Sequence, residues 1–235
     1  MNSNPQDRIL VKKYGLALHT ATPELGLAIS NFSGDSRCQT WNLGRSLATD
    51  LHQHLIEFIQ PQTWADLAFI AVAKGPGGFT GTRMGMVTAR TLAQQLDIPV
   101  FAISTLAAVA WAEPPQPPLA KGGLLSEELP LAKGGVLDIA LQMPAGRGEL
   151  FGAVYAANSN SGVTELFTDT VMTAESWQNK LESWENSYRL IEVGSELGAS
   201  VSGVLELAYL QWKQGSRPEW WDALPYYGQH PVKGQ

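Results

Sequence analysis

The order of the predicted elements in this 235-residue chain indicates an α/β protein built from two related lobes. Three short strands are followed by a helix, a strand, a helix, a strand and a helix over residues 14–112, and a shorter version of the same order fills 136–214. Hairpin strands that go on to alternate with helices are typical of a mixed sheet. We therefore predict duplicated βββαβα lobes at 9–112 and 136–235, separated by an insert at 113–135.

The first lobe opens with three strands. The segment YGLALHT at 14–20 reads as a buried strand, and LGLAISNF at 25–32 returns as the second strand of a hairpin. Residues 37–43 form the third strand, which carries Cys38. A single cysteine excludes an internal disulfide. We interpret Cys38 as a small strand side chain, because a reactive thiol needs a basic partner that the sequence does not place.

The next helix is predicted over 46–60 because it carries an apolar stripe at helical spacing. His52 and His54 stand two residues apart on this helix, so they cannot face one metal ion and are interpreted as solvated side chains. Pro61 ends the helix, and the apolar run 68–73 forms the following strand. The stripe consists of Leu47, Leu51, Leu55, Phe58 and Ile59.

A glycine-rich loop joins that strand to a second helix. Backbone N–H groups at such a junction can bind an anion at the helix N-terminus, although the spacing matches neither the Walker nor the dinucleotide pattern. The alternative is a tight connection whose glycines supply positive φ and let the helix lie close to a sheet. The residues favour the tight connection without excluding the other. The loop comprises Gly75, Pro76, Gly77, Gly78, Phe79, Thr80 and Gly81.

The second helix has one side with almost no side-chain bulk. Two glycines inside a helix cost about 1 kcal/mol each relative to alanine, so we expect another backbone to approach this side closely. That backbone could belong to the chain's own sheet or to a partner. Arg83, Met84 and Thr88 lie on neighbouring sides, and no acidic residue occurs between Leu67 and Leu96, which makes the surface locally basic. The small ridge consists of Gly81, Gly85, Ala89 and Ala93.

A short strand, IPVFAIS, and a helix that Ser104 caps complete the first lobe. The insert then contains four prolines in five residues, followed by PLAKGGLL and PLAKGGVL. We interpret it as a mobile surface linker that carries no chemistry. The aromatic tail, with Trp220, Trp221, Pro225, Tyr226 and Tyr227, is expected to pack on the body. The second lobe is predicted as strands at 136–143, 149–157 and 165–172, a helix from 173, a strand at 188–193 and a helix from 195 to 214.

Composition limits the function classes. A net charge of −6 argues against nucleic-acid binding by this chain alone, since phosphate contacts need clustered lysine and arginine. Four scattered histidines form no obvious zinc cluster. The first eight residues are polar, and no apolar run reaches the ~18 residues of a membrane helix. We expect a cytoplasmic protein with no membrane segment.

Several stretches resemble the TsaB family. They are LALHTAT, GPGGFTGTRMGMVTARTLAQQLDIPVFAISTLAAVA, AGRGELFGAVY and the late PYY. The resemblance covers most of the chain outside the insert and implies a two-lobed actin-like ATPase (sugar-kinase-like) fold. It also implies a non-catalytic subunit that dimerises with and activates TsaD, the enzyme that transfers threonylcarbamoyl to the tRNA adenosine beside the anticodon.

The same resemblance implies the partners. TsaD would bind the helices on either side of the glycine loop, and a homodimer would use that surface when TsaD is absent. A TsaE-like ATPase would join the full complex, and tRNA would be contacted only through the complex. No cofactor or metal is expected in this chain, although ATP is possible at the level of the complex. The interface residues implied are Leu47, Leu51, Leu55, Gly81, Arg83, Met84, Gly85, Thr88, Ala89 and Ala93.

Two positions depart from the family pattern. The first strand usually ends in an aspartate, which in ATPases of this fold helps to hold magnesium and phosphate; here His19 stands there. The aspartate before the second-lobe hairpin turn is Pro144. An ATP-dependent phosphotransferase-like enzyme is the alternative hypothesis, favoured by Lys74 and Arg83 and opposed by His19. A metallopeptidase ranks last, because the HxxxH pair of TsaD-like enzymes is missing.

Overall fold

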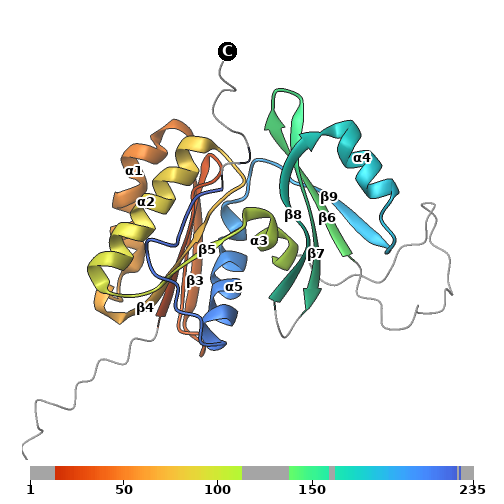
Figure 1. Ribbon diagram of the computed structural model, residues 1–235. Helices are drawn as coiled ribbons and strands as arrows, with labels where there is room; N and C mark the ends of the chain where they lie inside the picture. The colour runs from red at the N-terminus through yellow and green to blue at the C-terminus, as the bar shows by residue number, and fades with distance from the viewer. Residues whose placement is uncertain (1–13, 113–137, 159–161, 227, 229–235) are drawn as a thin grey trace, which may run out of the picture.

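The computed structural model describes residues 14–112, 138–158, 162–226 and 228, and contains two β-sheets with helices around and between them (Figure 1). The insert predicted at 113–135 lies outside the described residues, so its role stays a prediction.

The first sheet has the strand order β3-β2-β1-β4-β5. The first three strands pair antiparallel as successive hairpins, whereas β4 and β5 run parallel to β1. This is the mixed sheet that the alternation of hairpins and helices predicts. Its strands are β1 (Tyr14–His19), β2 (Glu24–Ser30), β3 (Ser36–Asn42), β4 (Leu67–Ala73) and β5 (Val100–Ile103).

Helices α1 (Leu47–Ile59) and α2 (Phe79–Leu96) cover one face of this sheet (Figure 1). Short 3₁₀ turns at Gly44–Ser46 and Trp64–Asp66 flank α1. Arg37 of β3 holds the end of α1, because its guanidinium donates to the carbonyls of Phe58, Ile59 and Gln60 at 2.7 to 2.9 Å. These carbonyls are among those that a helix leaves without partners at its C-terminus.

The second sheet has the order β8-β7-β6-β9, with β9 parallel to β6. Helix α4 (Ala174–Glu182) packs on its outer side (Figure 1), where the indole of Trp177 lies against Gly152. A Cβ at Gly152 would approach that ring to 2.6 Å, so only glycine lets the helix lie this close. The strands are β6 (Asp138–Gly146), β7 (Glu149–Asn158), β8 (Gly162–Thr173) and β9 (Tyr188–Glu192).

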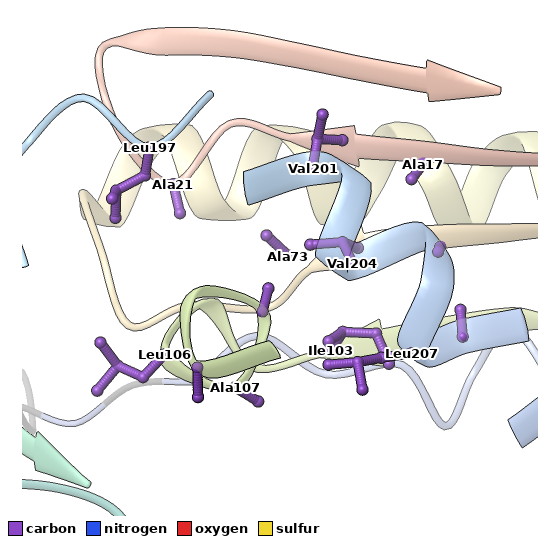
Figure 2. Close-up of a cluster of buried hydrophobic side chains, with 14 of the residues drawn as sticks. Ala17, Ala21, Ala73, Ile103, Leu106, Ala107, Leu197, Val201, Val204 and Leu207 are labelled. Carbon is purple, nitrogen blue, oxygen red and sulfur yellow. The ribbon is translucent and has the colours of Figure 1, made fainter. Parts of the chain in front are cut away.

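Two helices lie between the sheets. Helices α3 (Thr105–Ala112) and α5 (Val201–Lys213) contact each other; α5 packs on β1 and β4, while α3 reaches β6, β7 and β8. Figure 2 shows their side chains gathered with those of the first sheet. Helix α5 belongs to the second half of the sequence but covers the first sheet. The two sequence repeats therefore do not form two separately packed units.

The start of α5 corrects one boundary. A helix from Ser195 was expected, but a 3₁₀ turn at Gly198–Ser200 comes first and α5 begins at Val201. The backbone before the helix docks on the first sheet: the N–H of Gly198 donates to Glu24 at 2.8 Å, and a Cβ at Gly26 would lie 2.0 Å from the Gly198 carbonyl oxygen. This contact holds the preceding residues out of helical geometry.

The aromatic tail packs in part. Tyr226 and Trp220 are half-buried, and Arg90 of α2 lies 5.5 Å from the Trp220 ring centroid. Trp221 remains 54% exposed. Tyr227 lies outside the described residues.

Candidate functional site

The glycine loop packs against the turn that follows β1. A Cβ on Gly77 would lie 2.2 Å from the Ala21 carbonyl oxygen, and one on Gly81 would lie 2.2 Å from the carbonyl oxygen of Thr20. The N–H of Gly78 donates to the Ala21 carbonyl at 2.6 Å. Such close approaches exclude any side chain. The chain's own backbone therefore explains Gly77 and Gly81, and a positive φ explains Gly75, which favours the tight-connection interpretation.

The small ridge of α2 receives the side chain of Thr20. Its hydroxyl donates to the Gly81 carbonyl at 2.8 Å, and a Cβ on Gly85 would lie 2.1 Å from that hydroxyl oxygen. Further along the ridge, Ala89 and Ala93 are fully buried. The backbone expected at this ridge is thus the end of β1. Gly85, Ala89 and Ala93 are buried inside the chain and Gly81 is half-buried, and their assignment to a partner interface stays a prediction.

The apolar stripe of α1 is buried in the same way, and its assignment to the partner interface also stays a prediction. Leu47, Leu51 and Leu55 are buried in a cluster with side chains of β1, β2 and β4. Thr88 of α2 is also buried. A stripe that already packs on its own sheet cannot supply the main apolar contact to a partner. Of the predicted interface residues, Arg83 is exposed and Met84 is half-buried.

The outer surface of α1 and α2 carries an apolar groove. The two helices lie side by side (Figure 1), and the groove has a volume of about 620 Å³. Ile56 on one wall is 52% exposed and Val87 on the other is 63% exposed. No carboxylate lines it. We call it the α1–α2 groove; it is lined by His52, Leu55, Ile56, Trp64, Arg83, Met84, Val87, Thr88, Thr91 and Leu92.

Apolar surface continues from the groove towards the N-terminus of α2. Phe79, the first residue of the helix, is 57% exposed, and the guanidinium of Arg83 lies 4.4 Å from its ring centroid. Large exposed apolar side chains in one patch mark binding surfaces in soluble proteins. Ile56 and Val87 were missed by the sequence analysis, and Phe79 was predicted only as part of the glycine loop. Their signal was present, since each is a large apolar residue off the stripe or ridge that its helix buries.

A second concavity, of about 980 Å³, lies between the sheets. Its walls come from the glycine loop, the turn after β1, residues 143–146, Ser195 and Tyr226. Arg45 is the charged side chain among the described lining residues, and no carboxylate stands beside it. Magnesium with phosphate prefers oxygen ligands, carboxylates above all. The residues present therefore do not fit the metal–phosphate end of an ATPase site.

The two positions at which the sequence departs from the pattern of the resembled family, His19 and Pro144, also carry no carboxylate. His19 is completely buried, and neither ring nitrogen has a hydrogen-bond partner. Burial lowers the pKa of His19 from 6.5 to about 4, so the imidazole is neutral at physiological pH. Pro144 stands exposed near the tip of the β6–β7 hairpin. A neutral, enclosed imidazole and a proline offer no oxygen ligand to a metal ion.

The described residues contain neither a cluster of metal ligands nor a helix that could span a membrane. No group of three or more His, Cys, Asp or Glu side chains there is placed to hold a metal ion. None of the helices in the described part of the chain combines the length and the apolar character needed to cross a bilayer.

Comparison with known proteins identifies similar chains. A family model described as tRNA N6-adenosine threonylcarbamoyltransferase, TsaD, matches residues 52–121, from α1 to just beyond α3. The tRNA threonylcarbamoyladenosine biosynthesis protein TsaB of Buchnera aphidicola is 27% identical over 146 residues, which are 61% of this chain and 58% of that protein. TsaB of Bacillus subtilis is 56% identical over 45 residues, which are 19% of this chain and 20% of that protein. The chain is thus similar to TsaB proteins, as the resemblance predicts, and spans a little over half the length of the Buchnera protein.

A solved structure supports the fold. YeaZ from Pseudomonas aeruginosa matches with a TM-score of 0.66 at 21% identity, over 91% of this chain and 100% of that one. The chain therefore shares the fold of YeaZ, an α/β fold with two mixed sheets.

The contact between Thr20 and Gly85 gives the first testable prediction. We expect Gly85→Ala to lower the free energy of unfolding by roughly 2 kcal/mol, because the new methyl group overlaps the Thr20 hydroxyl. Thr20→Ala should recover part of the loss in the double variant, measured by urea unfolding as a double-mutant cycle. Gly78→Ala is the matched control, since its Cβ would meet nothing closer than 3.6 Å. If Gly85→Ala and Gly78→Ala lowered the free energy of unfolding equally, the contact between Thr20 and Gly85 would be contradicted.

The buried His19 gives a prediction about pH. Its pKa is lower in the folded chain, about 4, than the ordinary 6.5, so the stabilisation present above pH 6.5 is lost as the pH falls towards 4. We expect the wild type to lose roughly 2–3 kcal/mol more than His19→Asn between pH 7.5 and 4.5 in urea unfolding. His52→Asn, at an exposed position of α1, should behave as wild type. A His19→Asn variant as acid-sensitive as the wild type would show that His19 is not buried neutral.

Proposed function

We propose that this chain is the non-catalytic subunit that dimerises with and activates a TsaD-like catalytic subunit in the biosynthesis of tRNA threonylcarbamoyladenosine. The observation that carries this proposal is the α1–α2 groove, an exposed apolar surface on two helices that are rigidly packed on their own sheet. Its support includes the names of the Buchnera and Bacillus relatives, which place those proteins in that pathway.

The groove suits a helical partner. An amphipathic helix binds an apolar groove by inserting residues spaced three and four apart along one face. Val87 and Ile56 supply contact area on opposite walls, and Met84 between them offers a side chain that adapts to its neighbour. Because α2 contains no acidic residue, a partner helix that carries carboxylates beside its apolar face is favoured.

The proposed interface differs from the one that the family resemblance implies in which sides of the helices it uses. Arg83 and Met84 remain in it, with Leu55 and Thr88 at its floor. Ile56, Phe79 and Val87 replace the buried ridge. A homodimer in the absence of the catalytic subunit would cover the same surface, so the two assemblies exclude each other. A TsaE-like ATPase and tRNA would then meet this chain only within the complex, in the cytoplasm.

The enzymatic alternatives have less support. A phosphotransferase of this fold needs a carboxylate for magnesium in the cleft between the sheets, where the described wall offers Arg45 alone as a charged group. A metallopeptidase needs a cluster of ligands, and the described residues contain none. ATP at the level of the complex remains compatible with the proposal, because other subunits would supply the missing ligands.

The proposal predicts the effect of a charge in the groove. Val87→Glu and Ile56→Glu should each weaken the complex with the TsaD-like subunit of the same organism by about 100-fold, because association would bury an unpaired carboxylate. Both side chains are more than half exposed in the free chain, so the fold should be retained. Calorimetry of binding, with light scattering on a sizing column, measures both effects.

Leu224→Glu is the matched control, since Leu224 is 62% exposed but lies in the tail. It should bind as wild type. A complex that survives both groove substitutions would move the interface elsewhere on the chain. Absence of any complex with the wild-type chain would refute the proposed function itself.

A further inference from the structure

A buried polar network connects the two sheets on the opposite side of the first sheet from the α1–α2 groove. Its centre is Asp169 of β8, which is 6% exposed. The hydroxyl of Tyr155 on β7 donates to Asp169 Oδ1 at 2.7 Å and lies 3.3 Å from the hydroxyl oxygen of Ser104. Ser104 stands at the start of α3, where its Oγ accepts from the N–H of Ala107 at 3.2 Å. The network thus runs from the second sheet to a helix that follows β5.

Tyr226 makes a second connection between the same sheets. Its backbone N–H donates to the carbonyl of Lys74, just beyond β4, at 2.7 Å. Its hydroxyl donates to the backbone carbonyl of Asp169 at 2.6 Å. Its ring meets Phe151 of β7 edge-on, with the centroids 6.1 Å apart. One residue of the tail is therefore bonded to both sheets, and it also lines the cleft between them.

The environment makes these bonds costly to break. Burial raises the pKa of the Tyr155 hydroxyl and of the Asp169 carboxyl, and it raises the pKa of Tyr226 to about 12. The bond between Tyr155 and Asp169 lies within the second sheet, where it orients the Tyr155 hydroxyl. Separation of the sheets would break the contact of that hydroxyl with Ser104 and one of the two bonds of Tyr226. The charge of Lys74 favours the ionised form of Asp169 and adds to the attraction across the junction.

The other contacts between the sheets are mainly apolar. Helices α3 and α5 fill the space with small side chains such as Ala107, Ala108 and Ala208, and Figure 2 shows Ala107 among them. Apolar burial is non-directional, so it holds surfaces together without strongly fixing the angle between them. Hydrogen bonds depend on direction as well as distance. The polar network therefore adds directional contacts to the packing of the core.

We propose that Asp169, Tyr155 and Tyr226 form a clasp that holds the two sheets in one relative orientation and so sets the width of the cleft. Asp169 is the centre of the clasp. Through Tyr226 it is connected to Lys74, which precedes the glycine loop, and through Tyr155 to Ser104 at the start of α3. Loss of either tyrosine hydroxyl frees the second sheet to rotate about the α3–α5 packing while both sheets stay folded. This inference does not depend on the identity of the binding partner.

The single native cysteine allows a direct test. Cys38 is exposed on β3 of the first sheet and can carry one spin label. Asn179→Cys, at an exposed position of α4, supplies the second label on the other sheet. Pulsed electron paramagnetic resonance then measures the distance distribution between the two. We expect one narrow distance in this background.

Tyr155→Phe and Tyr226→Phe are then introduced singly and together. Each hydroxyl removed should raise the population of a second, displaced distance by about fivefold, the effect of one ordinary hydrogen bond. Tyr188→Phe is the matched control, since among the described residues its hydroxyl has no hydrogen-bond partner, and its distribution should stay as in the background. Amide exchange in β1 checks that the first sheet remains folded. If the double variant does not fold, the distance distributions of the two single variants test the proposal.

Unchanged distributions in both single variants, with β1 protection intact, would overturn the proposal, because the sheets would then be held by apolar packing alone. A uniform rise of amide exchange across both sheets, without a second distance, would also overturn it by showing a purely global effect on stability. Exchange that accelerates at Tyr226 and Thr105, whose amides are bonded to Lys74 and Gly75, supports the clasp.

Discussion

The close approach of α2 to the end of β1 determines most of what this chain presents to its surroundings. Thr20 occupies the space that side chains at positions 81 and 85 would fill, so the helix axis lies unusually near the strand. This contact decides which side of α2 is buried, and α1 then packs beside it on the same face of the sheet. The remaining outer sides of both helices form the α1–α2 groove. The binding surface is thus a consequence of an internal packing constraint.

The same contact shows how far the sequence could predict the structure. Four small residues at helical spacing correctly predicted that a backbone would lie against α2, because that inference needs only the cost of glycine in a helix. Periodicity could not identify the backbone, since a strand of the same chain and a partner helix require the same small ridge. The groove residues were missed for a related reason. Ile56 and Val87 lie off the dominant pattern, and only the packed structure shows that nothing in the described chain covers them.

Element order was predicted more reliably than element boundaries and contacts between distant segments. Hairpins followed by alternating helices and strands led directly to a mixed sheet in each half. The start of α5 was misplaced because Gly198 docks on Gly26 and Glu24, residues more than 150 positions away that no local signal connects to it. The polar network around Asp169 was not anticipated either, since an aspartate, two tyrosines and a serine spread over four elements form no sequence motif.

The cleft between the sheets and the α1–α2 groove differ in the side chains that line them. Next to the cleft between the sheets, His19 is buried and neutral, and the chain's own backbone lies against Gly77 and Gly81. That arrangement stabilises the scaffold and leaves the cleft without the groups for magnesium-dependent chemistry. On the outer face, exposed apolar side chains are retained although their exposure favours aggregation. The exposed apolar face on α1 and α2 is the surface on which the proposed binding function rests, whereas the proposed clasp acts on the cleft between the sheets.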